Sequence, residues 1–229
     1  MDGECMDKHL NPLAIFDLDK TLLEGDNELI WSEFLASQNL VGPEFIDKFN
    51  QFHLEYDKGT IIYSAYMKHL LKPIIGFSNQ KLQMLLGTYI EILRPLIRPR
   101  LIQRVEHHRF EGCAILLATS TNSILAEPIA RMLEIDNLVC TVAEIINEVP
   151  TGNLVGLPAF RQGKVTKVKN WIKKQPITLE GSWCYSDSYN DLPIMQLVQT
   201  PVAVSPDIKL RIISQENGWQ IMDGRGNSD

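Results

Sequence analysis

The chain has 229 residues, of which 45% are hydrophobic and 22% are charged, a composition that is ordinary for a globular protein. Its formal net charge is −6 and no basic stripe occurs, which argues against a nucleic-acid partner. No apolar run reaches the length of about 18 residues that a membrane span needs, so we predict no membrane segment.

The cysteines and the N-terminal segment indicate where the protein works. The four cysteines are scattered, with no CxxC motif and no ligand spacing (Cys5, Cys113, Cys140 and Cys184). The first residues, MDGECMDKHLNP, carry three acids and no apolar core typical of a signal peptide. We therefore predict a reduced, cytoplasmic protein.

The first predicted element is a short buried strand at 13–16, Leu-Ala-Ile-Phe, which runs into Asp17. Residues 24–96 instead show four stretches with helical spacing, punctuated by glycine and proline, and no clear strand. We predict that they form a helical cap domain inserted after the first strand. An insert at this point lies over the carboxyl edge of a sheet, where it can act as a lid.

Strands and helices are predicted to alternate after the insert. Apolar runs predict strands at 113–119, 138–141, 182–186 and 201–205, and amphipathic stretches predict helices at 121–134, 161–174, 188–198 and 206–217. The alternation indicates an α/β fold with a Rossmann-like parallel sheet flanked by helices. We assign residues 1–23 and 97–229 to this core domain and residues 24–96 to the cap.

Two carboxylates, Asp17 and Asp19, end the first strand one residue apart. Like charges this close repel each other unless a cation lies between them or one carboxyl holds a proton. A hard cation such as Mg²⁺ would relieve the repulsion. One carboxylate could then act as a nucleophile and the other as a general acid and base.

Other interpretations of these acids are weaker. Asp17, Asp19, Thr21 and Glu28 have the spacing of ligands in an EF-hand loop, but Leu22 stands where such a loop needs glycine. The two aspartates could also simply cap a turn or a helix. Taken alone, the two aspartates do not distinguish a capping role from a catalytic role.

Three further features of the sequence bear on the role of Asp17 and Asp19. Asp187 and Asp191 follow another predicted strand, Thr119 ends a third strand before a helix, and Lys164 is a cation in a helical stretch. In parallel sheets, ligands bind beyond the carboxyl ends of the strands, where these side chains would meet. Each feature has an ordinary alternative, a helix cap or a solvated lysine, when it is taken singly.

The four features together resemble the haloacid dehalogenase superfamily of phosphohydrolases, whose four motifs occur here in the family's order. The family's DxDxT motif matches Asp17 to Thr21, and its strand ending in Thr or Ser matches Thr119. Its lysine matches Lys164, and its acidic pair matches Asp187 and Asp191. The helical insert and the segments EPIARMLEIDNL, YSDSYNDLPIM and TPVAVSPDIKLR resemble the subgroup of phosphoserine phosphatases and related histidinol-phosphatases.

This resemblance implies a role for each acid. Asp17 would attack phosphorus and form an aspartyl-phosphate, and Asp19 would protonate the leaving alcohol and then activate water. Mg²⁺ would be held by the Asp17 side chain, the Asp19 backbone carbonyl and Asp187, with Asp191 supporting the metal site. The family pattern usually has glycine where this chain has Ser186, a departure that we expect to be tolerated.

The resemblance also implies the remaining contacts. Thr119 and Lys164 would hold the phosphoryl oxygens, and Asn190 and Ser120 would contact the phosphate or the rest of the substrate. Asp26 stands nine residues after the nucleophile, where similar phosphoserine phosphatases carry a glutamate that binds the substrate amine. These enzymes also carry a cap arginine for the substrate carboxylate, and this chain has no arginine from 24 to 93.

An acidic cap without arginine suits a substrate that has an amine and no carboxylate. Residues 24–93 hold nine acids and five lysines, a formal charge of −4. L-histidinol phosphate has this chemistry, and cap aromatics could stack on its ring or simply form the cap core (Trp31, Phe52, His53, Tyr56 and Tyr63). Phosphoserine is the alternative, and a phosphotransferase or phosphomutase, or a non-catalytic binding protein, stays open. The expected partner is a small phosphorylated metabolite, and the chain is expected to be a monomer or homodimer.

Overall fold

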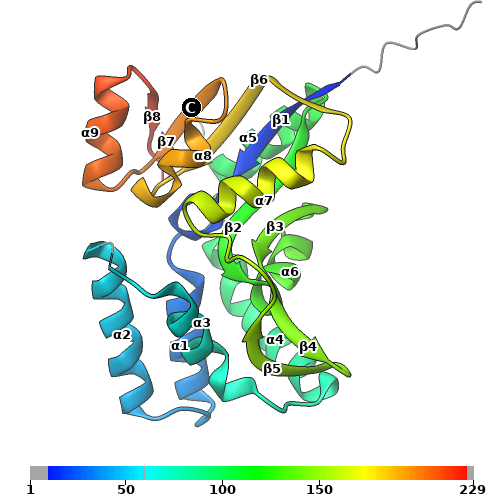
Figure 1. Ribbon diagram of the computed structural model, residues 1–229, viewed down its shortest axis with the longest axis vertical. Helices are drawn as coiled ribbons and strands as arrows, with labels where there is room; N and C mark the ends of the chain where they lie inside the picture. The colour runs from blue at the N-terminus through cyan, green and yellow to red at the C-terminus, as the bar shows by residue number, and fades with distance from the viewer. Residues whose placement is uncertain (1–9, 59, 226–229) are drawn as a thin grey trace, which may run out of the picture.

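The computed structural model describes residues 10–58 and 60–225, which form a core with a parallel sheet and a helical cap on one side of it (Figure 1). The sheet has the order β3-β2-β1-β6-β7-β8, and every neighbouring pair is parallel. Its strands are β1 (Asn11–Phe16), β2 (Ala114–Asn122), β3 (Asn137–Thr141), β6 (Ile177–Ser186), β7 (Thr200–Val204) and β8 (Gln220–Met222). The predicted α/β class is confirmed.

Helices cover both faces of the sheet because successive strand residues point to opposite sides. In β1, Ala14 and Phe16 pack with α5 and α6, whereas Leu13 and Ile15 pack with α7, α8 and α9. The core helices are α5 (Pro99–Phe110), α6 (Ser123–Met132), α7 (Gln162–Ile172), α8 (Leu192–Met195) and α9 (Ile208–Glu216).

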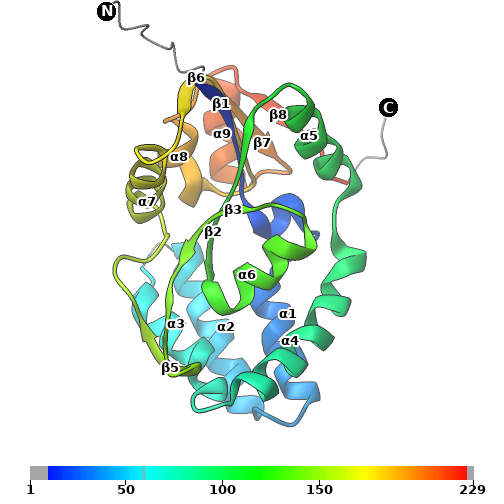
Figure 2. The same ribbon diagram turned by 90° about the vertical axis from the view of Figure 1, so that its right-hand side faces the viewer.

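The cap is a group of helices on one side of the core (Figure 2). Buried aromatic side chains lie between these helices. The helices are α1 (Asn27–Ser37), α2 (Pro43–Lys58), α3 (Tyr63–Leu71) and α4 (Asn79–Leu93). Trp31 of α1 meets Tyr89 of α4 edge to face at 4.9 Å between ring centroids, and the Tyr89 hydroxyl donates to the Asn27 carbonyl oxygen. These contacts fix the first turn of α1, which lies next to the core.

The chain enters and leaves the cap through two segments that lie side by side. Leu23 and Ile97 form an isolated antiparallel bridge, and backbone hydrogen bonds join Glu24 to Leu96 and Arg98 to Leu22. We propose this pairing as the boundary between the two domains, which keeps the assignment of 24–96 to the cap. Two adjacent segments that connect the domains in both directions suit a hinge.

Several predicted boundaries were wrong. The strand predicted at 113–119 continues to Asn122, so Thr119 lies within β2 and not at its end. The Asn122 side chain accepts from the Leu125 amide and caps α6, which explains why the helix begins only at Ser123. The helix predicted at 188–198 is a 3₁₀ turn followed by the four-residue α8.

The hairpin of β4 (Ala143–Ile146) and β5 (Val149–Leu154) was not predicted. Its two-residue turn, Asn147 and Glu148, has positive φ at both positions, the conformation that matches the twist of paired strands. The Gly76 amide donates to the Pro150 carbonyl oxygen, so the hairpin reaches from the core to the cap.

Candidate active site

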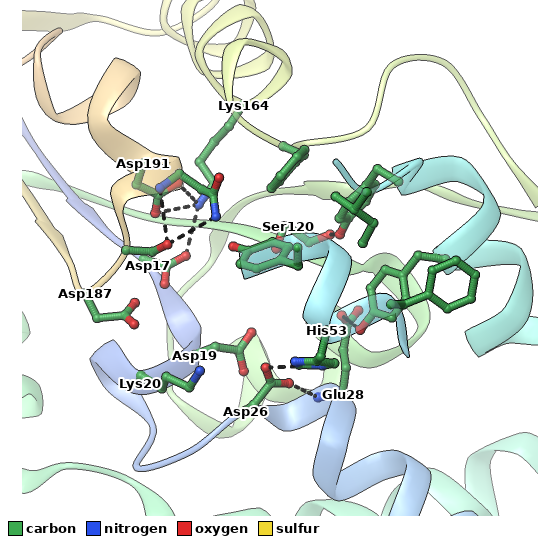
Figure 3. Close-up of a pocket in the computed structure, with 18 residues that line it drawn as sticks. Asp17, Asp19, Lys20, Asp26, Glu28, His53, Ser120, Lys164, Asp187 and Asp191 are labelled. Carbon is green, nitrogen blue, oxygen red and sulfur yellow. Dashed lines mark hydrogen bonds and ion pairs between the residues drawn. The ribbon is translucent and has the colours of Figure 1, made fainter. Parts of the chain in front are cut away.

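The carboxyl ends of the neighbouring strands β1 and β6 bring Asp17 and Asp187 to the same edge of the sheet (Figure 3). The Asp17 amide donates to the Tyr185 carbonyl oxygen and thereby continues the strand pairing by one residue. The Asp187 amide donates to the Thr21 hydroxyl oxygen at 3.1 Å, which ties the turn after β1 to the turn after β6. The predicted convergence of strand ends is therefore present.

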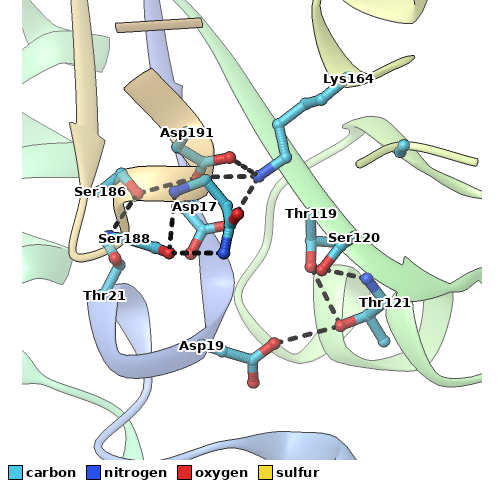
Figure 4. Close-up of polar contacts among 12 residues, drawn as sticks. Asp17, Asp19, Thr21, Thr119, Ser120, Thr121, Lys164, Ser186, Ser188 and Asp191 are labelled. Carbon is cyan, nitrogen blue, oxygen red and sulfur yellow. Dashed lines mark hydrogen bonds and ion pairs between the residues drawn. The ribbon is translucent and has the colours of Figure 1, made fainter. Parts of the chain in front are cut away.

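Lys164 lies in the first turn of α7 with a side chain that is almost fully buried between two carboxylates (Figure 4). Its Nζ donates to Asp17 Oδ1 at 3.0 Å and lies 2.6 Å from Asp191 Oδ1. Burial alone would lower the pKa of Lys164, but attraction to Asp17 and Asp191 outweighs it and raises that pKa. Lys164 is therefore a fixed cation at the base of the site.

Asp17 is an acid whose charge is only partly balanced. Burial raises the pKa of Asp17 to about 6 against the opposing effect of Lys164, and Asp191 adds to the increase. Lys164 contacts Oδ1 only, so the other carboxylate oxygen is available for chemistry. A buried carboxylate oxygen with its neighbour held by a cation is a well-oriented nucleophile.

Asp19 is held by hydrogen bonds from both the cap and the core. Its Oδ1 accepts hydrogen bonds from the Asn27 backbone amide at 2.6 Å and from Asn27 Nδ2 at 2.8 Å. The Thr121 hydroxyl lies 3.3 Å from its Oδ2. Burial raises the pKa of Asp19 to about 7, and the charges of Asp26 and Asp17 contribute. A carboxyl with this pKa can give up and take back a proton near neutral pH.

Thr119 and Ser120 occupy different positions relative to the pocket. Thr119 is fully buried, and its hydroxyl oxygen accepts from the Thr121 amide at 3.1 Å. Ser120 lines the pocket, and its carbonyl oxygen accepts from the Tyr63 hydroxyl of α3. The roles predicted for both residues toward a phosphoryl group stay predictions.

The pocket between core and cap is partly open to solvent and is lined by side chains of both domains. Acids of the core form one end, where Asn190 also lies with its side-chain oxygen bound to Arg161 Nε. Asp26 and Glu28 line the pocket from the start of α1 (Figure 3). Its aromatic walls are Phe52, His53, Tyr56, Tyr63, Tyr66 and Phe160.

Some predicted residues have other tasks. Asp26 caps α1, since its Oδ1 accepts from the Glu28 and Leu29 amides, and its Oδ2 lies 3.9 Å from His53 Nε2. Trp31 is buried in the cap core, as the alternative interpretation of the aromatics allowed.

Four site residues were not predicted from the sequence: Asn27 and Glu28 in α1, Tyr66 in α3 and Thr121 in β2. Glu28 was predicted only as an EF-hand position and as one of the cap acids. For Asn27 no local signal exists, because its contact with Asp19 depends on a turn. In that turn the Lys20 amide donates to the Gly25 carbonyl oxygen, and Lys20 has a φ of 54°.

The acids at the strand ends fit a hard divalent cation. Burial raises the pKa of Asp187 well above its ordinary value, and the charge of Asp17 adds to this. In the described part of the chain, Asp187 forms no ion pair. No cluster of three or more His, Cys, Asp or Glu side chains is found among residues 10–58 and 60–225. Two carboxylates with unbalanced charge suit Mg²⁺, which keeps several waters.

Asp191 is engaged differently from Asp187. Both of its oxygens lie within hydrogen-bond distance of Lys164 Nζ, and the Ser186 hydroxyl donates to Oδ2 at 2.8 Å. Direct binding of a metal by Asp191 would have to compete with these contacts. The prediction that Asp191 supports the metal site stays a prediction.

Comparison with known proteins places this fold and site in one class. Residues 14–196 match the family of haloacid dehalogenase-like hydrolases, and the chain belongs to this family. The predicted family and enzyme class are confirmed. No helix in the described ranges is long and apolar enough to cross a membrane.

Two phosphatases are similar to this chain over most of its length. The chain is 33% identical to a histidinol-phosphatase of Neisseria meningitidis serogroup C over 217 residues, which cover 92% of this chain and 98% of that protein. It is 33% identical to a phosphoserine phosphatase of Mycobacterium tuberculosis over 222 residues, which cover 94% and 72% of the two chains.

Solved structures share the fold. A protein of unknown function from Bordetella pertussis Tohama I has a TM-score of 0.86 and 32% identity, with coverage of 94% of this chain and 99% of that one. A substrate-bound phosphoserine phosphatase has a TM-score of 0.67 and 13% identity, with coverage of 88% and 90%. At this low identity the second likeness shows the fold alone.

Asn27 is expected to position Asp19. Replacing Asn27 with Ala removes the side-chain donor to Asp19, so the Asp19 carboxyl is held less firmly and its pKa rises further. We expect kcat for hydrolysis of a phosphate ester to fall roughly tenfold to a hundredfold. Steady-state kinetics across pH measure this, with the exposed cap residue Asn50 changed to Ala as the control. An unchanged kcat and pH profile would show that Asn27 contributes only to packing and does not position Asp19.

Proposed function

We propose that the protein is a Mg²⁺-dependent phosphatase that hydrolyses a small phosphorylated metabolite through an aspartyl-phosphate, with L-histidinol phosphate as its substrate. The observation that carries the proposal is the Lys164 cation fixed between Asp17 and Asp191, with one oxygen of Asp17 left for attack. The family match and the 33% identity to a histidinol-phosphatase support it.

The chemistry follows from the placement of the acids. The free oxygen of Asp17 attacks phosphorus, the ester bond breaks, and Asp19 gives its proton to the leaving alcohol. Asp19 then takes a proton from a water molecule, whose oxygen attacks the phosphorus of the aspartyl-phosphate. This second attack releases inorganic phosphate and restores Asp17. The route divides one difficult hydrolysis into two steps.

Charge neutralisation accompanies both steps. Lys164 is close enough to Asp17 to offset the negative charge of the phosphoryl group. Mg²⁺, held by Asp17, Asp187 and the Asp19 carbonyl oxygen, would supply further positive charge at the phosphoryl oxygens. Thr119, Ser120 and Asn190 would orient the phosphoryl group and the rest of the substrate.

The pocket supports an amine-bearing substrate without a carboxylate. Its described lining contains Asp26 and Glu28 at the cap end and no arginine, the usual bidentate partner of a carboxylate. Its aromatic walls offer faces on which an imidazole ring can stack. The identity to a phosphoserine phosphatase keeps phosphoserine as the second candidate. Cytoplasmic location and a monomer or homodimer stay part of the proposal.

Phosphate release with Mg²⁺ tests the proposal, using L-histidinol phosphate and phosphoserine in parallel. We expect kcat/KM to be at least about tenfold higher for L-histidinol phosphate, since each unpaired charge in a pocket costs about 1.4 kcal/mol or more. Preference for phosphoserine would keep the chemistry and contradict the substrate. Transfer of phosphate to an added alcohol in place of release would indicate a phosphotransferase or phosphomutase. The absence of turnover with any phosphate ester would indicate a non-catalytic binding protein.

A further inference from the structure

We propose that Glu28 is the specificity residue that binds the positive charge of the substrate at the cap end of the pocket. The inference rests on the proposed phosphatase function and goes beyond it by assigning a residue that lies outside the family's motifs. It also replaces Asp26 as the main partner of the substrate amine.

Glu28 has a carboxylate oxygen with no internal partner. The residue lies in the first turn of α1, is 6% exposed and lines the pocket (Figure 3). Its Oε2 accepts a hydrogen bond of 2.6 Å from the Tyr66 hydroxyl. Its Oε1 is buried and makes no hydrogen bond within the described ranges. A buried oxygen left without a partner costs free energy, which a bound donor would recover.

The charge of Glu28 is also unbalanced. No lysine, arginine or histidine in the described part of the chain forms an ion pair with it. Burial raises the pKa of Glu28 well above its ordinary value, and the charge of Asp26 adds to this, while hydrogen bonds from the Tyr66 hydroxyl and the Asn122 backbone amide oppose it. An ammonium or imidazolium group next to Glu28 would let the carboxylate ionise and would gain a charge-assisted hydrogen bond.

Asp26 is less suited to this task because one of its oxygens already caps α1. Oδ1 accepts from two backbone amides as the cap of α1, and Oδ2 faces His53 at 3.9 Å. An N-cap contact of this kind stabilises the helix, so it would be lost if Asp26 turned toward a ligand. Glu28 can bind a cation with no such loss.

The aromatic side chains around Glu28 favour the same kind of ligand. Phe52 and Tyr63 lie near Tyr66, with ring centroids 5.6 Å and 5.8 Å from the Tyr66 ring. All three line the pocket with Glu28. Aromatic faces attract cations. These side chains therefore favour a cation at this end of the pocket.

The experiment compares 2-aminoethyl phosphate with 2-hydroxyethyl phosphate in the presence of Mg²⁺, since the two esters differ only in the ammonium group. We expect the unmodified protein to have a higher kcat/KM for 2-aminoethyl phosphate than for 2-hydroxyethyl phosphate, so that the ratio of the two values is above one. Glu28→Gln keeps an acceptor for Tyr66 and removes the charge, and should lower this ratio at least tenfold. Glu28→Asp keeps the charge and should retain part of the preference.

Glu33→Gln is the matched control, because it removes an exposed acid from the same helix and should leave the ratio unchanged. Hydrolysis of p-nitrophenyl phosphate by the unmodified protein distinguishes a failure of the Glu28 assignment from a failure of the phosphatase function. If that ester is hydrolysed and the ratio is near one or unaffected by Glu28→Gln, the assignment of Glu28 is overturned and the phosphatase function stands. If no ester is hydrolysed, the phosphatase function itself fails.

Discussion

Asp17→Asn is expected to abolish phosphate release, with kcat reduced by at least about 10⁴-fold. The amide keeps the shape of the side chain and can still accept from Lys164 Nζ, but it cannot attack phosphorus. No aspartyl-phosphate should then be trapped when the enzyme is denatured with acid during turnover, whereas the unmodified protein should show one by mass spectrometry.

The variant should fold, which makes its inactivity interpretable. Asp17→Asn removes a buried charge that lies near Asp187 and Asp191, and Lys164 keeps Asp191 as its partner. We expect a Tm within a few degrees of that of the unmodified protein. Asp47→Asn, at an exposed position on α2, removes the same charge far from the chemistry and serves as the control. Retention of more than about 1% of the activity by Asp17→Asn would show that another group attacks phosphorus.

The sequence was sufficient to predict the fold and the acidic end of the site. A parallel α/β sheet has only one edge where carboxyl strand ends meet, so Asp17 and Asp187 had to converge once the strands were identified. Lys164 was assigned from the resemblance of the four motifs to a known family, because a lysine in a helix taken alone is most often a solvated charge. The convergence of the acids depended on the direction of the strands, which follows from local pattern.

The cap end of the site could not be predicted in the same way. Asn27 reaches Asp19 only because the chain turns back at Lys20 and Gly25, and positive φ at a lysine has no sequence signal. Glu28 stood among nine cap acids, and its burial depends on Tyr66, which comes from a different helix. The hairpin turn at 147–148 has Asn and Glu, whereas glycine at the second position would have been a clearer sequence signal for a hairpin.

Lys164→Met is expected to reduce both activity and stability. Loss of the cation removes the charge that offsets the phosphoryl group, so kcat/KM should fall by about 10³-fold or more. It also leaves Asp17 and Asp191 buried without a partner, which should lower the free energy of unfolding by about 3 kcal/mol. Phosphate release and urea denaturation measure the two effects, with the exposed Lys169→Met of the same helix as the control.

The pH dependence of stability has a definite sign in metal-free buffer. A carboxyl whose folded pKa is raised contributes stability below its unfolded pKa and loses that contribution as pH rises through the folded value. The pKa of Asp17 is already raised to about 6 with Lys164 present and must rise further without it. The deficit of Lys164→Met should therefore be small near pH 5 and largest near pH 8. A deficit that is independent of pH would mean that lost packing, and not charge, is responsible.

A second substitution separates the structural role of Lys164 from its catalytic role. Adding Asp191→Asn to Lys164→Met removes one of the two buried charges and keeps an acceptor for the Ser186 hydroxyl. We expect the double variant to recover about 1 to 2 kcal/mol of stability, because unpaired buried charge is the main cost. Activity should not recover, because no cation then faces Asp17. If stability and activity returned together, Lys164 would act only by supporting the fold, and the electrostatic account of the site would be wrong.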